Sequence, residues 1–310
     1  MTTIRYNFRQ IFIMVLLTVF SSSYAADKPQ KVITVTIPKF GSGLVETWIK
    51  KYTEAHPDVQ IRLVAGSDEE ADLRFVSEIA GEEDKADSRV TYVGRYALLP
   101  VTTVQNPLYE QITRRRFDEK ALKKLFFQHN ALQEVENGKK RDELREGVTV
   151  YSGTNRVSGA NAFAAYFGYQ TAQLRGKRIA GDDIYLLTAI SKDHTGVTFN
   201  NLTYLFDLES RKLKPQLSLL PLDVKKEQGE ILRNGDLDET LQLLENDAIT
   251  LVPLREVGFA YKDKHIVAGF LHWIVSEGQQ YNHDFGFLTL DKKQAQKEKK
   301  QLETKLLTSR

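Results

Sequence analysis

Two short loops, at residues 41–43 and 152–161, combine glycine with small hydroxyl residues just before an expected helix. Backbone N–H groups without a partner point out of the first turn of a helix, and the helix dipole adds partial positive charge there. Serine and threonine hydroxyls add donors without bulk, so such a loop can bind a phosphate, a sulfate or a carboxylate. Ser42 and Ser158 could equally be plain N-cap residues that only satisfy their own helices.

Arg156 strengthens the second loop as an anion site. Its guanidinium is always charged, and its planar fork of donors suits a tetrahedral oxyanion or a carboxylate. Neither loop has the lysine and Ser/Thr pair that follows the glycines of a nucleotide-binding P-loop. The two loops and the arginine therefore favour a small-anion site without the signature of a nucleotide site.

Residues for catalysis or for metal binding do not occur at the spacings that such sites need. The chain has six histidines and no cysteine, which excludes thiolate nucleophiles, Cys-ligated zinc and iron–sulfur clusters. His265 and His272 are the closest approach to a metal pair, but no acidic third ligand stands at a regular spacing from them. No Gly-x-Ser-x-Gly turn is present to carry a nucleophilic serine. We therefore expect no enzymatic activity, no metal site and no cofactor.

The composition is that of an ordinary globular chain. Its 310 residues include 43 Lys and Arg against 41 Asp and Glu, a formal net charge of +2, and 41% are hydrophobic. This excludes a disordered or collagen-like chain. It also gives no sign of a nucleic-acid partner, which would normally require a marked excess of positive charge. The length suggests about two domains.

Residues 1–25 have the three-part pattern of a secretory signal peptide. Arg5 and Arg9 precede an apolar stretch over 11–20, and small residues lead up to Ala25. The apolar stretch is about half as long as the ~20 residues that a membrane-spanning helix needs. We expect cleavage after Ala25, export to the periplasm, and a mature chain that folds without disulfides.

The elements that must position the two loops follow an α/β pattern. Strand 32–37 and helix 44–52 flank the first loop, and strand 148–151 and helix 162–167 flank the second. The other expected elements are helices at 121–126, 182–190, 237–244 and 267–276, and extended segments at 59–63, 72–76, 96–101, 197–199, 217–220, 251–261 and 286–288.

The two strands expected at 59–63 and 72–76 pose a problem of connection. The segment between them is too short for the crossover helix that usually joins parallel strands. We therefore expect these two strands to pair antiparallel, or one of them not to be a strand.

A helix, a turn and a strand near the C-terminus stand in a particular order. The helix over 268–276 is followed by Gly278-Gln279 and then by Gly286-Phe287-Leu288. Upstream, a Gly-Ser turn follows the first strand, an apolar run ends in Pro100, and a Ser-Gly-Ala loop opens a helix. This order, over most of the chain, resembles that of the phosphate-binding proteins of bacterial ABC importers.

The resemblance implies a fold of two lobes. The family is of the type 2 periplasmic binding protein kind, with two α/β lobes joined by two hinge strands and a ligand cleft between the lobes. The hinge strands would be 96–101 and 251–261. The chain would then divide into a signal peptide, two segments of the first lobe and one segment of the second, which are 1–25, 26–101 with 252–310, and 102–251.

The resemblance also implies which residues would hold the anion. In the first lobe these are Ser42 and the amide of Gly43, and in the second lobe they are Arg156, Ser158 and Gly159.

A further pair of residues would serve a protonated phosphate. Ser77 and Glu78 correspond to the family's Ser-Asp after the third strand, where a carboxylate accepts a hydrogen bond from the ligand. The sequence departs from the family in having Glu at 78, an arginine one residue nearer the Ser-Gly, Ala160 in place of Thr, and no helix between the second and third strands.

The function implied is that of an extracytoplasmic solute-binding protein. It would bind phosphate or a similar oxyanion, act as a monomer and deliver the ligand to the membrane permease of an ABC importer. The departures support an alternative, in which the chain is a protein-interaction module of the cell envelope that has kept the fold and lost the ligand.

Overall fold

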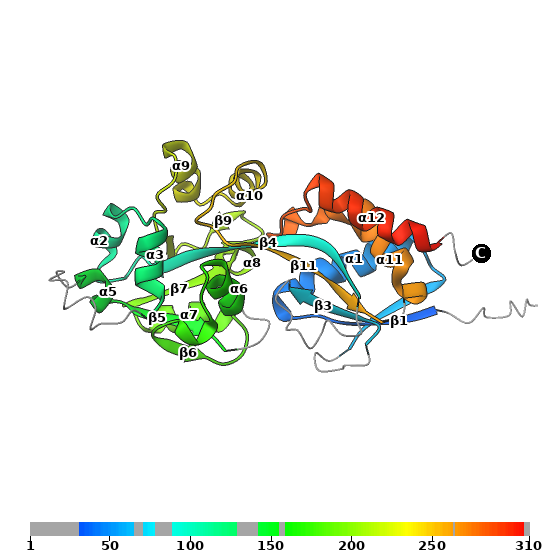
Figure 1. Ribbon diagram of the computed structural model, residues 1–310, viewed down its shortest axis with the longest axis horizontal. Coiled ribbons are helices and arrows are strands. Elements are labelled where there is room, and N and C mark those ends of the chain that lie inside the picture. Colours follow the sequence, from blue (N-terminus) through cyan, green and yellow to red (C-terminus); the bar gives the residue numbers. More distant parts are fainter. Residues whose placement is uncertain are drawn as a thin grey trace, which may run out of the picture.

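Nine strands form one mixed sheet in the computed structural model, which describes residues 31–64, 71–77, 89–128, 142–154, 159–262 and 264–306. These strands are β1 (Lys31–Thr36), β2 (Val59–Leu63), β3 (Leu73–Ser77), β4 (Arg89–Thr103), β5 (Thr149–Gly153), β6 (Lys177–Ile179), β7 (Gly196–Asn201), β10 (Leu217–Leu219) and β11 (Leu254–Tyr261). Their order is β2-β1-β3-β11-β4-β7-β5-β6, and β10 also pairs with β4. Figure 1 shows two α/β lobes with β4 and β11 running between them.

The strand β4 belongs to both lobes. Its first half pairs antiparallel with β11, from Arg89 opposite Tyr261 to Ala97 opposite Leu254. Its second half pairs antiparallel with β7 along one edge and with β10 along the other. The extended segments expected at 96–101 and 251–261 fall on β4 and β11, and the expected two-lobe α/β fold with two hinge strands is confirmed.

In the first lobe, β2 and β3 lie on opposite sides of β1, and both are parallel to it. The expectation that β2 and β3 pair antiparallel, or that one of them is not a strand, was therefore wrong. The reason is a stagger: β2 ends with Leu63 opposite Val35, and β3 begins with Leu73 opposite the same residue. Because the chain re-enters the sheet at the level where it left, the connection only has to pass across β1, a distance of about two strand spacings.

An aromatic core holds the helices of the first lobe onto its sheet. The apolar positions of α1 recur on one face, and Trp48 and Tyr52 on that face pack against Phe259 and Phe270. Trp48 is fully buried, and its indole N–H donates to the carbonyl of Gly278 at 2.8 Å. The helices of this lobe are α1 (Ser42–Ala55), α11 (Lys264–Ser276) and α12 (Lys292–Leu306).

The second lobe has β5, β6 and β7 in parallel, with β5 in the middle. Its core is also aromatic, and the rings of Phe163 and Phe199 stack 3.8 Å apart. The helices of this lobe in Figure 1 include α2 (Tyr109–Arg114), α3 (Glu119–Phe126), α5 (Glu143–Gly147), α6 (Gly159–Tyr166) and α7 (Ile184–Lys192). Between β7 and β11 come α8 (Leu202–Leu205), the small hairpin β8 (Phe206–Asp207) and β9 (Lys212–Leu213), α9 (Lys226–Asn234) and α10 (Leu237–Asn246).

Two details differ from the sequence expectation. Residues 286–288 do not form a strand, and Leu288 makes only an isolated bridge with Arg95 of β4. The helix α9 was not predicted, because its mostly charged sequence has few apolar residues to set a period. Within the described part of the chain, no helix is both long and apolar enough to cross a membrane.

Candidate functional site

The predicted site residues that the structure describes lie at the carboxyl ends of parallel strands. In the first lobe, α1 begins just after β1, and Ser77 is the last residue of β3, opposite Val257 of β11. In the second lobe, α6 begins with Gly159 after β5, and β7 ends at Asn201. Ligands of open α/β sheets bind at these edges. The topology therefore places Ser42, Gly43, Ser77 and Gly159 where a ligand site is expected.

Ser42 is not the N-cap of α1. The N-cap position belongs to Gly41, which has no side-chain cap, and the hydroxyl of Ser42 donates to the carbonyl of Lys39 at 2.9 Å. This bond closes the short 3₁₀ turn η1 (Lys39–Gly41) that precedes the helix. To donate to an anion, the Ser42 hydroxyl would have to give up the bond to Lys39.

An aromatic ring covers the start of α1. A Cβ atom added to Gly43 would come within 2.7 Å of the ring of Phe285, so only glycine permits this approach. Phe285 ends the 3₁₀ turn η5 (His283–Phe285), whose carbonyl groups are held from the side of α8 and of the β8–β9 hairpin. Thr203 donates to the carbonyl of Phe285 at 2.8 Å, and Arg211 donates to those of His283 and Asp284 at 2.9 and 3.2 Å.

Glu245 of α10 fixes the same C-terminal segment. One of its carboxylate oxygens accepts hydrogen bonds from His283 at 3.0 Å, from the Thr289 amide at 2.6 Å and from the Thr289 hydroxyl at 2.8 Å. Burial alone would raise the pKa of Glu245, but these hydrogen bonds outweigh it and lower the pKa to about 2. The bond to Glu245 in turn raises the pKa of His283. The start of α1 is therefore joined, through Phe285 and its neighbours, to α8 and α10.

At the start of α6, an internal carboxylate takes the position of an anion. The amide of Gly159 donates to Oδ2 of Asp183 at 2.6 Å. A Cβ atom on Gly159 would come within 2.9 Å of Leu98 in the hinge strand β4, so glycine allows the hinge and the helix to approach closely. The first turn of α6 thus donates a hydrogen bond to an acidic oxygen, and that oxygen belongs to the chain itself.

Asp183 is held in a setting that disfavours its charge. Burial raises the pKa of Asp183 to about 6, although the hydrogen bond from Gly159 lowers it and the neighbouring Asp182 carboxylate raises it further. Its second oxygen, Oδ1, is buried and has no hydrogen-bond partner among the described residues. Burial and the Asp182 carboxylate also raise the pKa of Tyr204. The start of α6 therefore faces acidic groups as well as hydrogen-bond donors.

Sequence reasoning missed Asp183 because Asp182 and Asp183 looked like the ordinary acidic start of the helix expected at 182–190. Only Asp182 behaves in that way, since its Oδ1 accepts from the amide of Ile184 at 2.9 Å. The cap of this helix requires only one carboxylate. The second, adjacent carboxylate was the feature of the sequence that could have indicated another role for Asp183.

Three of the predicted contacts lie outside the described residues: Glu78, Arg156 and Ser158. Their role toward an anion stays a prediction, and the same holds for the signal peptide at 1–25. Ser77 is half-buried at the end of β3. In the described part of the chain, no group of three His, Asp or Glu side chains could hold a metal ion.

Comparisons with known proteins bear on the fold. No protein-family model matches the chain, and no curated protein matches its sequence. Its structure is similar to that of a protein assigned as a phosphate ABC transporter substrate-binding protein from Clostridium perfringens, solved with bound phosphate, with a TM-score of 0.58 and 13% identity over 84% of this chain and 100% of that one. It is also similar to an ABC-type phosphate transport receptor from Vibrio cholerae, with a TM-score of 0.53 and 12% identity over 83% and 100% of the two chains. At these identities the similarity shows the fold.

Proposed function

We propose that this protein is an extracytoplasmic solute-binding protein that takes up a small oxyanion between its lobes, with phosphate as the first candidate. It is exported by the signal peptide at 1–25, has no enzymatic activity, and delivers its ligand as a monomer to the membrane permease of an ABC importer. The fold supports this proposal, because the two similar structures are described as components of phosphate transporters.

The observation that carries the proposal is the hydrogen bond between Gly159 and Asp183. A carboxylate oxygen accepts from the first amide of α6 at 2.6 Å, so this helix start has the geometry and the polarity to hold an oxyanion. An incoming phosphate would need the same donor. It would therefore either displace the Asp183 carboxylate or find Asp183 protonated, in which state the carboxyl O–H could donate to the ligand.

A second candidate function is favoured by a specific pair of contacts. Phe285 covers the start of α1 at Gly43, and Asp183 occupies the start of α6 at Gly159. Both positions that would hold an anion are then filled by side chains of the chain itself. This arrangement fits a protein-interaction module of the cell envelope in which the two lobes are held together without a ligand.

Thermal unfolding with added anions separates the two functions. The protein is unfolded and refolded to remove any bound ligand, and its unfolding is followed with phosphate, sulfate, molybdate and small carboxylates. A ligand at a hundred times its dissociation constant stabilises the folded state by ~2.7 kcal/mol, which raises the melting temperature. Under the solute-binding proposal, at least phosphate or one related oxyanion gives this shift.

Two matched variants locate the effect. Asp183→Asn removes the competing charge at α6 and should strengthen anion binding, since asparagine leaves the fold intact and is easier to displace. Asp182→Asn removes a charge from the neighbouring residue, which does not contact Gly159, and should change anion binding much less. If no oxyanion stabilises either the wild type or Asp183→Asn, the solute-binding proposal fails and the interaction module is the better description.

A further inference from the structure

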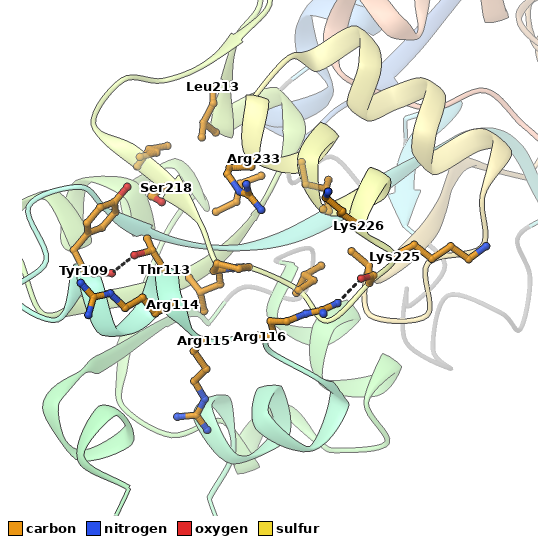
Figure 2. Close-up of a pocket in the computed structure, with 18 residues that line it drawn as sticks. Tyr109, Thr113, Arg114, Arg115, Arg116, Leu213, Ser218, Lys225, Lys226 and Arg233 are labelled. Atoms are coloured by element: carbon orange, nitrogen blue, oxygen red, sulfur yellow. Dashed lines mark hydrogen bonds between the residues drawn. The ribbon is translucent and has the colours of Figure 1, made fainter.

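A cavity lies in the second lobe and shares no residue with the candidate anion site. It has a volume of about 530 Å³ and is lined by residues from 109–116, 213–226 and 229–233, so we name it the α2–α9 pocket. Figure 2 shows these lining side chains. The volume lies within the range of about 300 to 1,000 Å³ that is usual for small-molecule sites.

One wall of the α2–α9 pocket is apolar and rigid. Leu217, Leu220, Leu222 and Leu232 line it, and all four belong to the buried core. Because these side chains are fixed by packing, the apolar wall is formed before any ligand arrives. A ligand that buried an apolar body against it would gain roughly 25 cal/mol for each Å² removed from water.

The charged residues that line this pocket all have one sign. Its lining contains six basic residues and no Asp or Glu, namely Arg114, Arg115, Arg116, Lys225, Lys226 and Arg233.

Most of these cations already have partners, but Arg233 does not. Arg115 pairs with Asp142, Arg116 with Asp223, Arg114 with Glu110, and Lys226 with Glu230. Within the described residues, Arg233 makes no hydrogen bond and no ion pair. In Figure 2 the guanidinium of Arg233 lies among the lining side chains, whereas the guanidinium of Arg115 and the ammonium of Lys225 extend away from them.

The sequence of α9 separates its two faces by charge. Lys226, Gly229 and Arg233 recur at helical spacing and line the α2–α9 pocket. Glu227 and Glu230 lie on the other face, toward α10. Acidic side chains on this helix are thus kept out of the pocket.

Gly229 keeps the pocket wall open at the middle of α9. A Cβ atom added there would meet only Val224, at an ordinary contact distance of 3.7 Å. Glycine in a helix interior costs up to about 1 kcal/mol relative to alanine, and nothing in the surrounding packing requires it at this position. Its effect is to leave this part of the pocket wall without a side chain.

We propose that the α2–α9 pocket binds a small amphiphilic anion, a carboxylate or a phosphate monoester on an apolar body. The anionic head pairs with Arg233, and the hydroxyl groups of Tyr109 and Ser218, which make no hydrogen bond within the described residues, are available as further donors on the lining. The apolar body lies against the leucine wall. An inorganic anion would make no contact with this wall, and a cationic amphiphile would be repelled by the basic lining.

Isothermal titration with four compounds tests the proposal. We expect decanoate and decyl phosphate to bind saturably with one site per chain. Decylammonium, which has the same tail and the opposite charge, should bind at least tenfold more weakly. Inorganic phosphate at the same concentration should not displace decanoate, and this keeps the result separate from the anion site between the lobes.

Paired variants connect binding to the α2–α9 pocket. Gly229→Phe fills the pocket and should abolish decanoate binding, whereas Gly229→Ala, at the same position, should leave it within about threefold. Arg233→Gln removes the free guanidinium and should weaken binding about tenfold, as expected for the loss of a charge-assisted hydrogen bond. Arg62→Gln is the matched control, because Arg62 is an exposed residue of β2 in the other lobe.

The source of the amphiphile is distinguished by vesicles. If the protein floats with phosphatidylglycerol vesicles and Gly229→Phe does not, the ligand is a membrane lipid. If decanoate binds and vesicles do not, the ligand is a free amphiphile. The proposal is overturned if neither amphiphile binds, if binding survives Gly229→Phe unchanged, or if decylammonium binds as well as decanoate.

Discussion

Replacing Asp183 with asparagine should stabilise the protein at neutral pH. Burial raises the pKa of this carboxyl from 3.8 to about 6, so the charged form is disfavoured in the folded state. A difference of about two pKa units corresponds to ~3 kcal/mol, since each unit is about 1.4 kcal/mol. Asparagine carries no charge, and its carbonyl oxygen can still accept the hydrogen bond from Gly159. We therefore expect Asp183→Asn to raise the free energy of unfolding by about 2 to 3 kcal/mol at pH 7.5.

The sign of the pH dependence follows from proton binding. Between pH 3.8 and about 6, the folded protein binds more protons at Asp183 than the unfolded chain does, because the pKa is higher in the folded state. The stability associated with this group is fully present below pH 3.8 and is lost as the pH rises through about 6. The gain from Asp183→Asn should therefore be small at pH 4 and largest above pH 7.

Denaturant unfolding at several pH values measures this difference directly. Urea titrations of the wild type, Asp183→Asn and Asp182→Asn are compared at pH 4, 5.5 and 7.5, with the free energy of unfolding extrapolated to water. The control Asp182→Asn should lack most of the gain in the free energy of unfolding, because Asp182 accepts its hydrogen bond from the amide of Ile184, in the helix that it precedes. A wild type that is more stable than Asp183→Asn at pH 7.5, or a gain that does not depend on pH, would refute the reasoning.

Three further predictions concern other parts of the molecule. Glu245→Gln should destabilise the fold by about 1 to 3 kcal/mol, chiefly between pH 4.5 and 6.5. The lowered pKa of Glu245 contributes stability that is lost as the pH falls toward 2, and the raised pKa of His283 contributes stability that is lost above pH 6.5. Urea unfolding against pH measures the loss of stability, and a loss that stays constant up to pH 9 would contradict this prediction. Arg156→Ala should remove most of the thermal shift given by phosphate and leave the melting temperature without ligand nearly unchanged, and an undiminished phosphate shift would count against Arg156 as a ligand contact. Mass spectrometry of the protein expressed in a bacterial host should find the mature N-terminus at Ala26, within a residue or two, and a soluble protein that keeps Met1 would exclude the proposed cleavage.

The parts of the fold that could be predicted depend on local sequence. The face of α1 that carries Trp48 was predicted because its apolar residues recur every three or four positions. The segments 96–101 and 251–261 were predicted to be extended from their local pattern, and their role as hinge strands was implied by the family resemblance. The arrangement of β2 and β3 around β1 could not be predicted in this way, since it depends on a stagger between strands that no local pattern records.

In the candidate site, too, the local elements could be predicted and the contacts between distant segments could not. Glycine and serine before a helix marked the starts of α1 and α6, and the structure has helices beginning there. The groups that occupy those starts come from elsewhere in the chain. Asp183 is 24 positions from Gly159, and Phe285 comes from the C-terminal block that returns to the first lobe. Their approach depends on the complete fold, so spacing in the sequence could not indicate it.

The two proposed functions therefore differ in one physical property of the helix starts, namely how firmly the internal groups are held there. An oxyanion and Asp183 need the same amide of Gly159, so the free energy of anion binding is reduced by whatever is needed to move or protonate that carboxylate. The raised pKa of Asp183 makes the carboxylate a poor occupant at neutral pH, which lowers the cost of replacing it.

Phe285, at the start of α1, acts in the opposite direction. Its turn is held by Thr203, Arg211 and the Glu245 cluster, so uncovering Gly43 means breaking several hydrogen bonds at once. An anion could thus enter at α6 more easily than at α1, and opening of the lobes, rather than the chemistry of the loops, would limit ligand binding.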